Sequence, residues 1–279
     1  KQFIKKAFQH YLSRDVIENI LNDPGRLKLG GERKTLTIFF SDIQGFSTIS
    51  EKMNPQELTS FLNDYLSEMT DIIFQEGGTL DKYEGDAIIA FWNAPVNQVD
   101  HAERGCRAAL RCAQRLNELR GEWAERYGSP LYARIGMHTG EVVVGNMGSK
   151  ERFDYTVLGD AANLASRLEG ANKVFGTYIM ISGETRQAAG EGMGARRIGR
   201  IRVVGRKTPV TVYELLTMDA KDLPEWVPIY EKGLDAVFSN DWKNALELFQ
   251  SLENDPLAQK YLVRCREVLQ GSEWNGIWN

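Results

Sequence analysis

Two aspartates, Asp42 and Asp86, are the residues of this sequence whose types and positions could do chemistry. One lies in TIFFSDIQGF (residues 37–46) and the other in DKYEGDAIIAFW (residues 81–92). Each stands at the end of an apolar run beside a glycine turn, where a bend in the backbone can lift a carboxylate out of the core. Two such oxygen donors suit a pair of hard divalent cations. Either aspartate alone would carry little weight, because an Asp at a strand end is more often a turn or cap residue.

Strands are needed to position these carboxylates. Residues 35–40 are β-branched and aromatic, which predicts a buried strand. Residues 79–83 and 86–92 predict a hairpin turned at Glu84-Gly85. With a two-residue loop Tyr83 would pair with Asp86, so Lys82 would point to the opposite face. We therefore expect Lys82 and Asp86 to serve different pockets.

The spacing of apolar residues predicts two amphipathic helices. Asn54, Pro55 and Glu57 predict the start of the first, with an N-cap and capping box, and Gly77-Gly78 predicts its end. Residues 100–127 predict the second helix, whose arginines form an outward face that we interpret as solvated.

The second half of the chain alternates strands and helices. Residues 131–137 and 141–144 predict a hairpin turned at Thr139-Gly140. Residues 152–158 lead into a helix that carries Asn163 and Arg167 one turn apart on one face. Further strands are expected at residues 178–181, 195–204 and 210–215. The pattern predicts an α/β or α+β sandwich, with a mixed sheet flanked by helices.

Three segments are predicted. Residues 1–32 are expected to contain an amphipathic helix, residues 3–21, and a turn-rich linker; residues 33–217 form the main domain; residues 218–279 form a helical extension. In the last segment Gly233, Ala245 and Phe249 have the spacing of a tetratricopeptide helix pair. Because one copy is too little for a repeat array, we expect a small C-terminal helical hairpin packed on the main domain.

Composition excludes several classes of protein. The chain has 279 residues, 42% of them hydrophobic and 26% charged, and a net charge of −4, which argues against a nucleic-acid binder. Three cysteines without metal-ligand spacing predict a reducing compartment. No stretch predicts a membrane span or a signal peptide, and no GxxxxGK[ST] loop is present. Since the chain begins at Lys1, we expect a cytoplasmic piece of a longer protein, whose upstream part could hold a membrane anchor.

Three blocks of the sequence resemble the signature blocks of class III nucleotide cyclases: FSDIQGF, KYEGDAI and YTVLGDAANLASRLE. The resemblance covers about residues 3–216 and has the order and spacing of that family. It implies the ferredoxin-like, palm-type cyclase fold. It also implies an adenylate cyclase, a lyase that converts ATP to 3′,5′-cyclic AMP and pyrophosphate in signal transduction.

The resemblance assigns roles to residues of this chain. Asp42, Asp86 and the backbone carbonyl of Ile43 would hold two Mg²⁺ or Mn²⁺ ions, Asn163 would orient the ribose, and Arg167 would stabilise charge on the α-phosphate. Further candidates for phosphate binding are Arg206 in GRKTP, its neighbour Lys207, and Arg152.

Lys82 and Thr156 stand where the family selects the base. A lysine can donate to adenine N1, whereas guanine N1 carries a proton and needs an acceptor, so Lys82 favours ATP. The common adenylyl pattern has Asp at the second position, and Thr156 departs from it. A hydroxyl is both donor and acceptor and discriminates less firmly. Threonine here resembles a subgroup of bicarbonate-responsive soluble and cyanobacterial cyclases, which makes bicarbonate stimulation a hypothesis.

The resemblance also implies a head-to-tail homodimer with two shared sites. Asp42 and Asp86 would come from one chain, and the partner would supply the residues that bind the base, ribose and phosphates. Two alternatives stay open: a guanylyl or relaxed-specificity cyclase, and a non-catalytic cyclase-like module that senses nucleotide or bicarbonate.

Overall fold

The computed structural model describes residues 29–149, 151–203, 206 and 208–279. The helix predicted in residues 3–21 and the phosphate candidate Lys207 lie outside these residues. Among the described helices, none combines the length and the apolar character needed to cross a membrane.

A mixed sheet runs through the described chain in the strand order β2-β3-β1-β4-β6-β8-β7-β9, with β5 paired to β4 beside this path. Two of its pairs, β4 with β6 and β7 with β9, are parallel, and the other pairs are antiparallel. The strands are β1 (Gly30–Ile43), β2 (Thr79–Glu84), β3 (Ala87–Trp92), β4 (Ala133–Gly148), β5 (Phe153–Leu158), β6 (Ile179–Ser182), β7 (Gly194–Ile201), β8 (Val210–Thr217) and β9 (Ile277–Trp278).

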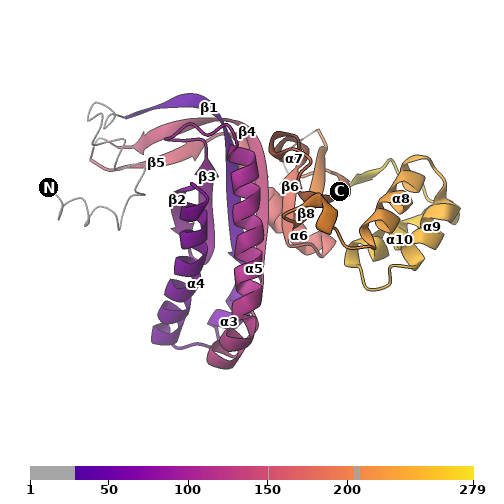
Figure 1. The fold of residues 1–279 in the computed structure, drawn as a ribbon, viewed down its shortest axis with the longest axis horizontal. Coiled ribbons are helices and arrows are strands. Elements are labelled where there is room, and N and C mark those ends of the chain that lie inside the picture. Colours follow the sequence, from indigo (N-terminus) through magenta and orange to yellow (C-terminus); the bar gives the residue numbers. More distant parts are fainter. Residues whose placement is uncertain (1–28, 150, 204–205, 207) are drawn as a thin grey trace.

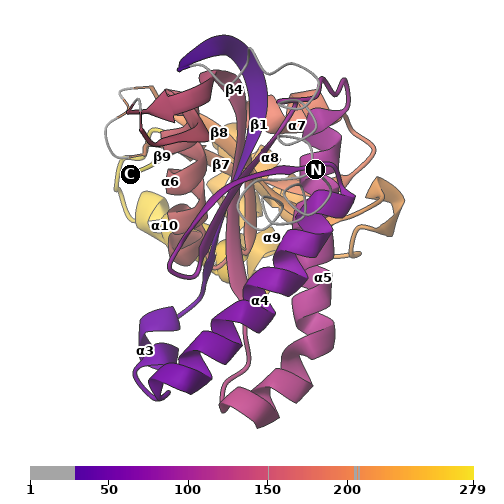
Figure 2. The ribbon, with the colours of Figure 1, turned by 90° about the vertical axis from the view of Figure 1, so that its left-hand side faces the viewer.

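Helices cover both faces of this sheet, which confirms the predicted mixed sheet flanked by helices. Figures 1 and 2 show α4 and α5 side by side on one face, and α6 lies against β4 and β1 on the other. The helices are α3 (Phe46–Ser50), α4 (Pro55–Gln75), α5 (His101–Tyr127), α6 (Asp160–Phe175), α7 (Gly183–Ala189), α8 (Val227–Phe238), α9 (Trp242–Gln250) and α10 (Pro256–Leu269).

The start of α4 has the predicted capping box. Asn54 Oδ1 accepts from the Glu57 amide at 2.9 Å, and Glu57 Oε2 accepts from the Asn54 amide at 3.0 Å. Two donors that an unassisted helix start would leave unpaired are satisfied in this way.

The hairpin predicted at Thr139-Gly140 is wrong, because β4 continues through both residues to Gly148. Glycine is needed here for close packing. A Cβ at Gly140 would lie 3.0 Å from Ala161 Cβ on α6, and one at Gly136 only 2.0 Å from the Glu169 amide nitrogen. The glycines of β4 thus let α6 lie directly on the sheet, and α6 carries Asn163 and Arg167.

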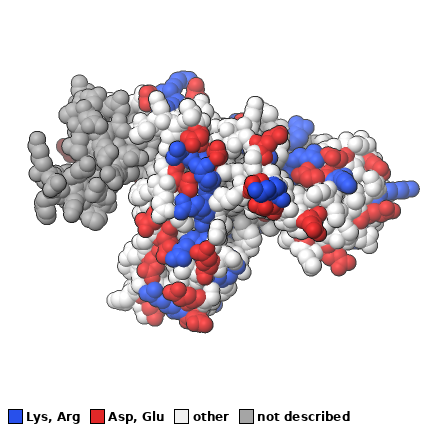
Figure 3. Space-filling view, in the orientation of Figure 1, with Lys and Arg blue, Asp and Glu red and all other residues white. Residues whose placement is uncertain are grey.

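Several arginines of α5 reach toward α4 and its C-terminal end, and the expected solvated face is a set of ion pairs. Arg107 and Arg111 both bind Glu76 at 3.0 and 2.7 Å, and Arg115 Nε lies 2.7 Å from Glu68. Figure 3 shows Lys and Arg interspersed with Asp and Glu over this face, so these helices present no continuous basic surface.

The C-terminal extension contains the expected helical hairpin, α8 with α9, and adds a third helix, α10, and the edge strand β9. A Cβ on Gly233 would lie 2.8 Å from the Phe249 ring, so the small residue of the tetratricopeptide-like spacing lets the two helices approach. One hydrophobic cluster joins these helices to α6 and to strands β6 to β8. Figure 1 shows the extension at the end of the molecule away from α4 and α5. Its boundary at residue 218 stays a prediction.

Candidate active site

The end of β1 and the β2–β3 turn bring Asp42, Ile43 and Asp86 together. The Ile43 amide donates to Asp86 Oδ2 at 2.9 Å, and the carboxyl groups of Asp86 and Asp42 hydrogen-bond each other. Burial, and then this bond to Asp42, raise the pKa of Asp86 to about 7, against the lowering effect of the Ile43 amide. Two carboxylates this close resist joint ionisation, and a divalent cation bound by both would remove this repulsion.

The donor set of this pair fits divalent cations. Both groups offer oxygen, and neither is neutralised by a lysine or arginine contact in the described chain. The described residues contain no group of three or more His, Cys, Asp or Glu side chains that could hold a metal. The further ligands would therefore be the Ile43 carbonyl, water and substrate phosphates, as is usual for Mg²⁺.

Glu169 adds a third carboxyl group to these surroundings, and the sequence reasoning missed it. Burial, and then the negative charge of Asp42, raise the pKa of Glu169 to about 7, while Arg134 lowers it. Glu169 follows Arg167 by two residues on α6, but no spacing rule connects it to a strand end far away in the sequence.

The hairpin register differs from the prediction by one residue. Glu84 pairs with Ala87 and Tyr83 with Ile88, so the two-residue turn is Gly85-Asp86. Gly85 has a φ of 65°, which suits the first turn position, where the prediction had placed Glu84. Asp86 thus lies in the turn itself, and strand alternation does not decide where its side chain points.

Lys82 and Thr156, the predicted base-binding residues, contact the same side chain. It belongs to Asp81, which the sequence reasoning missed. Thr156 Oγ1 donates to Asp81 Oδ2 at 2.7 Å, and Lys82 Nζ lies 3.5 Å from Asp81 Oδ1. Lys82 and Asp86 therefore have different partners within the chain, but the register argument for opposite faces is wrong, and that the two residues serve different pockets stays a prediction.

The face of α6 that carries Asn163 and Arg167 has one unsatisfied cationic group. Asn163 is exposed, and Arg167 is half-buried with its Nη1 atom buried and without a hydrogen-bond partner in the described residues. Arg206, which follows β7 in the chain, contacts the first residue of this helix: its Nε is 3.2 Å from Asp160. A buried guanidinium nitrogen without a partner is costly, and a phosphate oxygen would satisfy it.

Arg152 lies elsewhere, in the exposed turn between β4 and β5. Its amide donates to Ser149 Oγ at 3.1 Å, which closes that turn. The other predicted residues thus form three groups. These are Asp42 with Ile43 and Asp86, Lys82 with Thr156, and the α6 residues Asn163 and Arg167 with Arg206.

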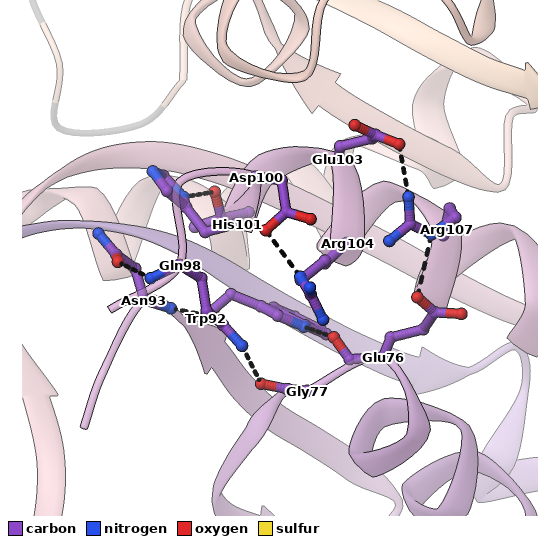
Figure 4. A network of polar contacts seen from close by, with 11 residues as sticks. Glu76, Gly77, Trp92, Asn93, Gln98, Asp100, His101, Glu103, Arg104 and Arg107 are labelled. Carbon is purple, nitrogen blue, oxygen red and sulfur yellow. Dashed lines mark hydrogen bonds and ion pairs between the residues drawn. The ribbon is translucent and has the colours of Figure 1, made fainter. Parts of the chain in front are cut away.

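A polar network holds the other end of the β2–β3 hairpin in place (Figure 4). Trp92 Nε1 donates to the Glu76 carbonyl at 3.0 Å, and Gln98 Nε2 donates to the Gly77 carbonyl at 2.8 Å. Gln98 also exchanges two hydrogen bonds with Asn93. These contacts tie the end of β3 to the end of α4, so the strand that leads back to Asp86 is fixed at its far end.

Known proteins resemble this chain over the same region. The family described as adenylate and guanylate cyclase catalytic domain matches residues 31–217. "Adenylate cyclase 1" of Rhizobium meliloti (strain 1021) is 39% identical over 186 residues, which are 66% of this chain and 28% of that protein. "Adenylate cyclase" of Anabaena cylindrica is 34% identical over 220 residues, 77% of this chain and 42% of that protein. The chain thus spans less than half of the length of these relatives.

Solved structures give the same fold. The adenylyl cyclase CyaB from P. aeruginosa aligns with a TM-score of 0.64 and 37% identity, over 70% of this chain and 100% of that one. The guanylyl cyclase Cya2 aligns with a TM-score of 0.60 and 37% identity, over 67% of this chain and 94% of that one. Overall similarity therefore does not decide between adenine and guanine.

Proposed function

The chain belongs to the adenylate and guanylate cyclase catalytic domain family, and from this premise we propose that it is an adenylate cyclase, which makes 3′,5′-cyclic AMP and pyrophosphate from ATP. The observation that carries the proposal is the pair Asp42 and Asp86, two adjacent carboxyl groups beside the Ile43 backbone at one end of the sheet. Such a pair gains most from divalent cations, which this chemistry requires and this family generally uses.

Asp42, Asp86 and the Ile43 carbonyl would hold two Mg²⁺ or Mn²⁺ ions. When bound, these ions supply Lewis-acid polarisation of the ribose 3′-oxygen and neutralise triphosphate charge. The protein residues do the rest. Asn163 hydrogen-bonds the ribose and holds its 3′-oxygen in line with the α-phosphate, and Arg167 compensates the charge that builds up there. Arg206 binds phosphate, with Lys207 and Arg152 as further candidates.

Lys82 and Thr156 would select the base. Lys82 Nζ donates to adenine N1, and Thr156 Oγ1 accepts from the adenine amino group. A guanylyl or relaxed-specificity cyclase is the second candidate, and the similarity to the guanylyl cyclase Cya2 favours it as much as the similarity to CyaB favours ATP. A non-catalytic sensing module is the third, and the presence of Asp42, Asp86, Asn163 and Arg167 disfavours it.

The test of the activity is product formation from ATP and GTP in parallel, with Mg²⁺ and with Mn²⁺, at high protein concentration. We expect cyclic AMP, little cyclic GMP, and a loss of about a thousandfold or more in Asp42→Ala, because removing a metal ligand costs several kcal/mol in the transition state. Asp222→Ala removes an exposed carboxylate far along the chain and is the matched control. A dimeric sample that makes no cyclic nucleotide contradicts the proposal and favours the sensing module.

In a head-to-tail homodimer, two equivalent active sites would be shared between the protomers. Asp42 and Asp86 of one protomer would face Lys82, Thr156 and the α6 residues of its partner. The separate partners of Lys82 and Asp86 within one chain support this arrangement. Mixing Asp42→Ala with Arg167→Ala should restore about a quarter of wild-type activity, because random pairing yields half heterodimers and each has one intact site. A mixture proven to contain heterodimers that stays inactive would contradict shared sites.

Bicarbonate stimulation, a cytoplasmic location and a role in cyclic AMP signalling stay predictions. Initial rates with and without bicarbonate at constant pH test the first of these.

A further inference from the structure

Asp81 is an extra residue in β2. Leu80 pairs with Ala90 and Lys82 pairs with Ile89, so Asp81 has no partner across the hairpin and forms a β-bulge. Bulges redirect side chains and are common beside active sites. This one places Asp81 against Thr156 of β5, a strand that is not its neighbour in the sheet order.

The Asp81 carboxylate is buried, although nothing in the core requires a charge there. Its side chain is only 2% exposed, whereas that of Lys82 is 42% exposed and reaches outward. Oδ2 accepts the Thr156 hydroxyl proton at 2.7 Å, and Oδ1 is buried without a hydrogen-bond partner in the described residues. Burial raises the pKa of Asp81, and the Thr156 hydrogen bond and the Lys82 charge counteract this. A buried carboxylate is costly even with these partners, and an amide would tie the two strands together with less penalty.

The hydrogen bond has a direction that matters for recognition. An ionised carboxylate can only accept, so Thr156 must use its single proton toward Asp81. Its remaining lone pairs then face outward, and the hydroxyl, otherwise able to donate or accept, becomes an acceptor only. The 6-amino group of adenine can donate to such an oxygen, whereas the 6-oxo group of guanine repels it.

We propose that Asp81 is a positioning residue that fixes Thr156 as a hydrogen-bond acceptor and so makes the nucleotide site selective for 6-aminopurine triphosphates. This inference rests on the proposed function, since it assumes that Thr156 meets the base. The same carboxylate holds Lys82 as the neighbouring donor. Acceptor and donor then match the amino group and N1 of adenine, and oppose the 6-oxo group and protonated N1 of guanine.

The test compares the ratio of kcat/KM for ATP to that for GTP in wild type and Asp81→Asn. An asparagine amide can donate to Thr156, which frees the hydroxyl to donate to a 6-oxo group. We expect the ratio to fall about tenfold, which corresponds to about 1.4 kcal/mol. Asp154→Asn, an exposed carboxylate two residues before Thr156, is the matched control and should leave the ratio unchanged. Because the ratio is internal to each sample, a smaller folded fraction cancels.

A double-mutant cycle separates the relay through Thr156 from other effects. In a Thr156→Val background Asp81→Asn should no longer change the ratio, because the hydroxyl that it orients is absent. An equal fall in both backgrounds overturns the relay, as does an unchanged ratio in Asp81→Asn beside a lowered one in Thr156→Val. If Asp81→Asn does not fold, Asp81→Glu keeps the carboxylate, displaces it by one methylene, and should show a smaller fall.

Failure of the proposed function would look different. If the wild type turns over neither nucleotide, the cyclase activity is overturned, and the role of Asp81 is read instead from competition of ATP and GTP for a fluorescent nucleotide analogue. A lower ATP preference of Asp81→Asn in that assay supports the positioning role. An unchanged preference overturns it.

Discussion

Two charged clusters in this molecule are built in opposite ways. Asp42 and Asp86 are like charges placed side by side, and burial, with the hydrogen bond and charge of Asp42, raises the pKa of Asp86 to about 7. Arg196, 3% exposed, lies between opposite charges: its Nε is 2.6 Å from Glu214, and its two terminal nitrogens bind Asp255 at 2.6 and 2.9 Å. One cluster is incomplete within the chain, and the other is complete.

The complete cluster explains how the C-terminal extension is held. Arg196 is on β7, Glu214 on β8, and Asp255 at the start of α10, where it also accepts from the Ala258 amide at 3.0 Å. The guanidinium also lies 4.7 Å from the centre of the Tyr230 ring of α8. Because every partner belongs to the chain, this cluster needs nothing from outside, and its role is structural.

The incomplete cluster teaches the converse. A fold gains nothing from two adjacent carboxyl groups that repel each other, so their placement indicates a ligand of opposite charge. Arg167 adds a buried Nη1 without a partner in the described residues, a property it shares with the Nε atoms of Arg120 and Arg264. Unsatisfied charge of both signs is thus found in the residues assigned to the candidate site, and satisfied charge at the junction with the extension.

The largest effect on stability is expected from breaking the complete cluster. Arg196→Met keeps much of the side-chain volume but leaves Glu214 and Asp255 as uncompensated buried charges. We expect it to lower the free energy of unfolding by about 3–5 kcal/mol, measured by denaturant titration. Arg200→Met, an exposed arginine on the same strand, should change it by about 0.5 kcal/mol or less.

Removing the whole cluster sharpens the comparison. Arg196→Met combined with Glu214→Gln and Asp255→Asn leaves no unpaired charge, and the side-chain amide oxygen introduced by Asp255→Asn can still cap α10. Most of the lost stability should return, because the penalty lies in the charges left behind. A triple variant as unstable as Arg196→Met would show that the arginine packing, and not its charge balance, holds the extension.

The sequence allowed the incomplete cluster to be predicted but not the complete one. Asp42 and Asp86 were found because each stands at a strand end beside a glycine, which is a local signal. Arg196 is 18 residues from Glu214 and 59 from Asp255, and no local pattern links them. The capping box at Asn54 and Glu57 was correct for the same reason, since all of its atoms lie within one helical turn.

Register was the limit of the sequence reasoning in the sheet. Gly85 was placed second in its turn and occupies the first position, and Gly140 was interpreted as a turn although it allows α6 to approach the sheet. The bulge at Asp81 depends on contact with β5, so it could not be seen within β2 alone. The groups of residues were therefore predictable, and the contacts that orient them were not.

The smallest expected effect is on the stability of the metal-free protein, and it has a defined pH dependence. The pKa of Asp86 is about 7 in the folded state, above the usual 3.8, so the folded chain keeps a proton that the unfolded chain loses. Asp86 therefore destabilises the fold increasingly as pH rises from about 4 to about 7, and the cost is constant above that. Asp86→Asn removes this cost and can still accept from the Ile43 amide.

We therefore expect Asp86→Asn, in EDTA, to melt a few degrees above wild type at pH 8 and at nearly the same temperature at pH 4.5. Other carboxyl groups with raised pKa values, Glu169 among them, are common to both proteins and largely cancel in the difference. Mn²⁺ at pH 8 should then stabilise the wild type more than the variant, because only the wild type offers the cation two carboxylates. If the difference in melting temperature between the two proteins stays the same across this pH range, ionisation of Asp86 does not destabilise the fold. The Asp42–Asp86 pair would then not be an unsatisfied cluster, and its contrast with the Arg196 cluster would be wrong.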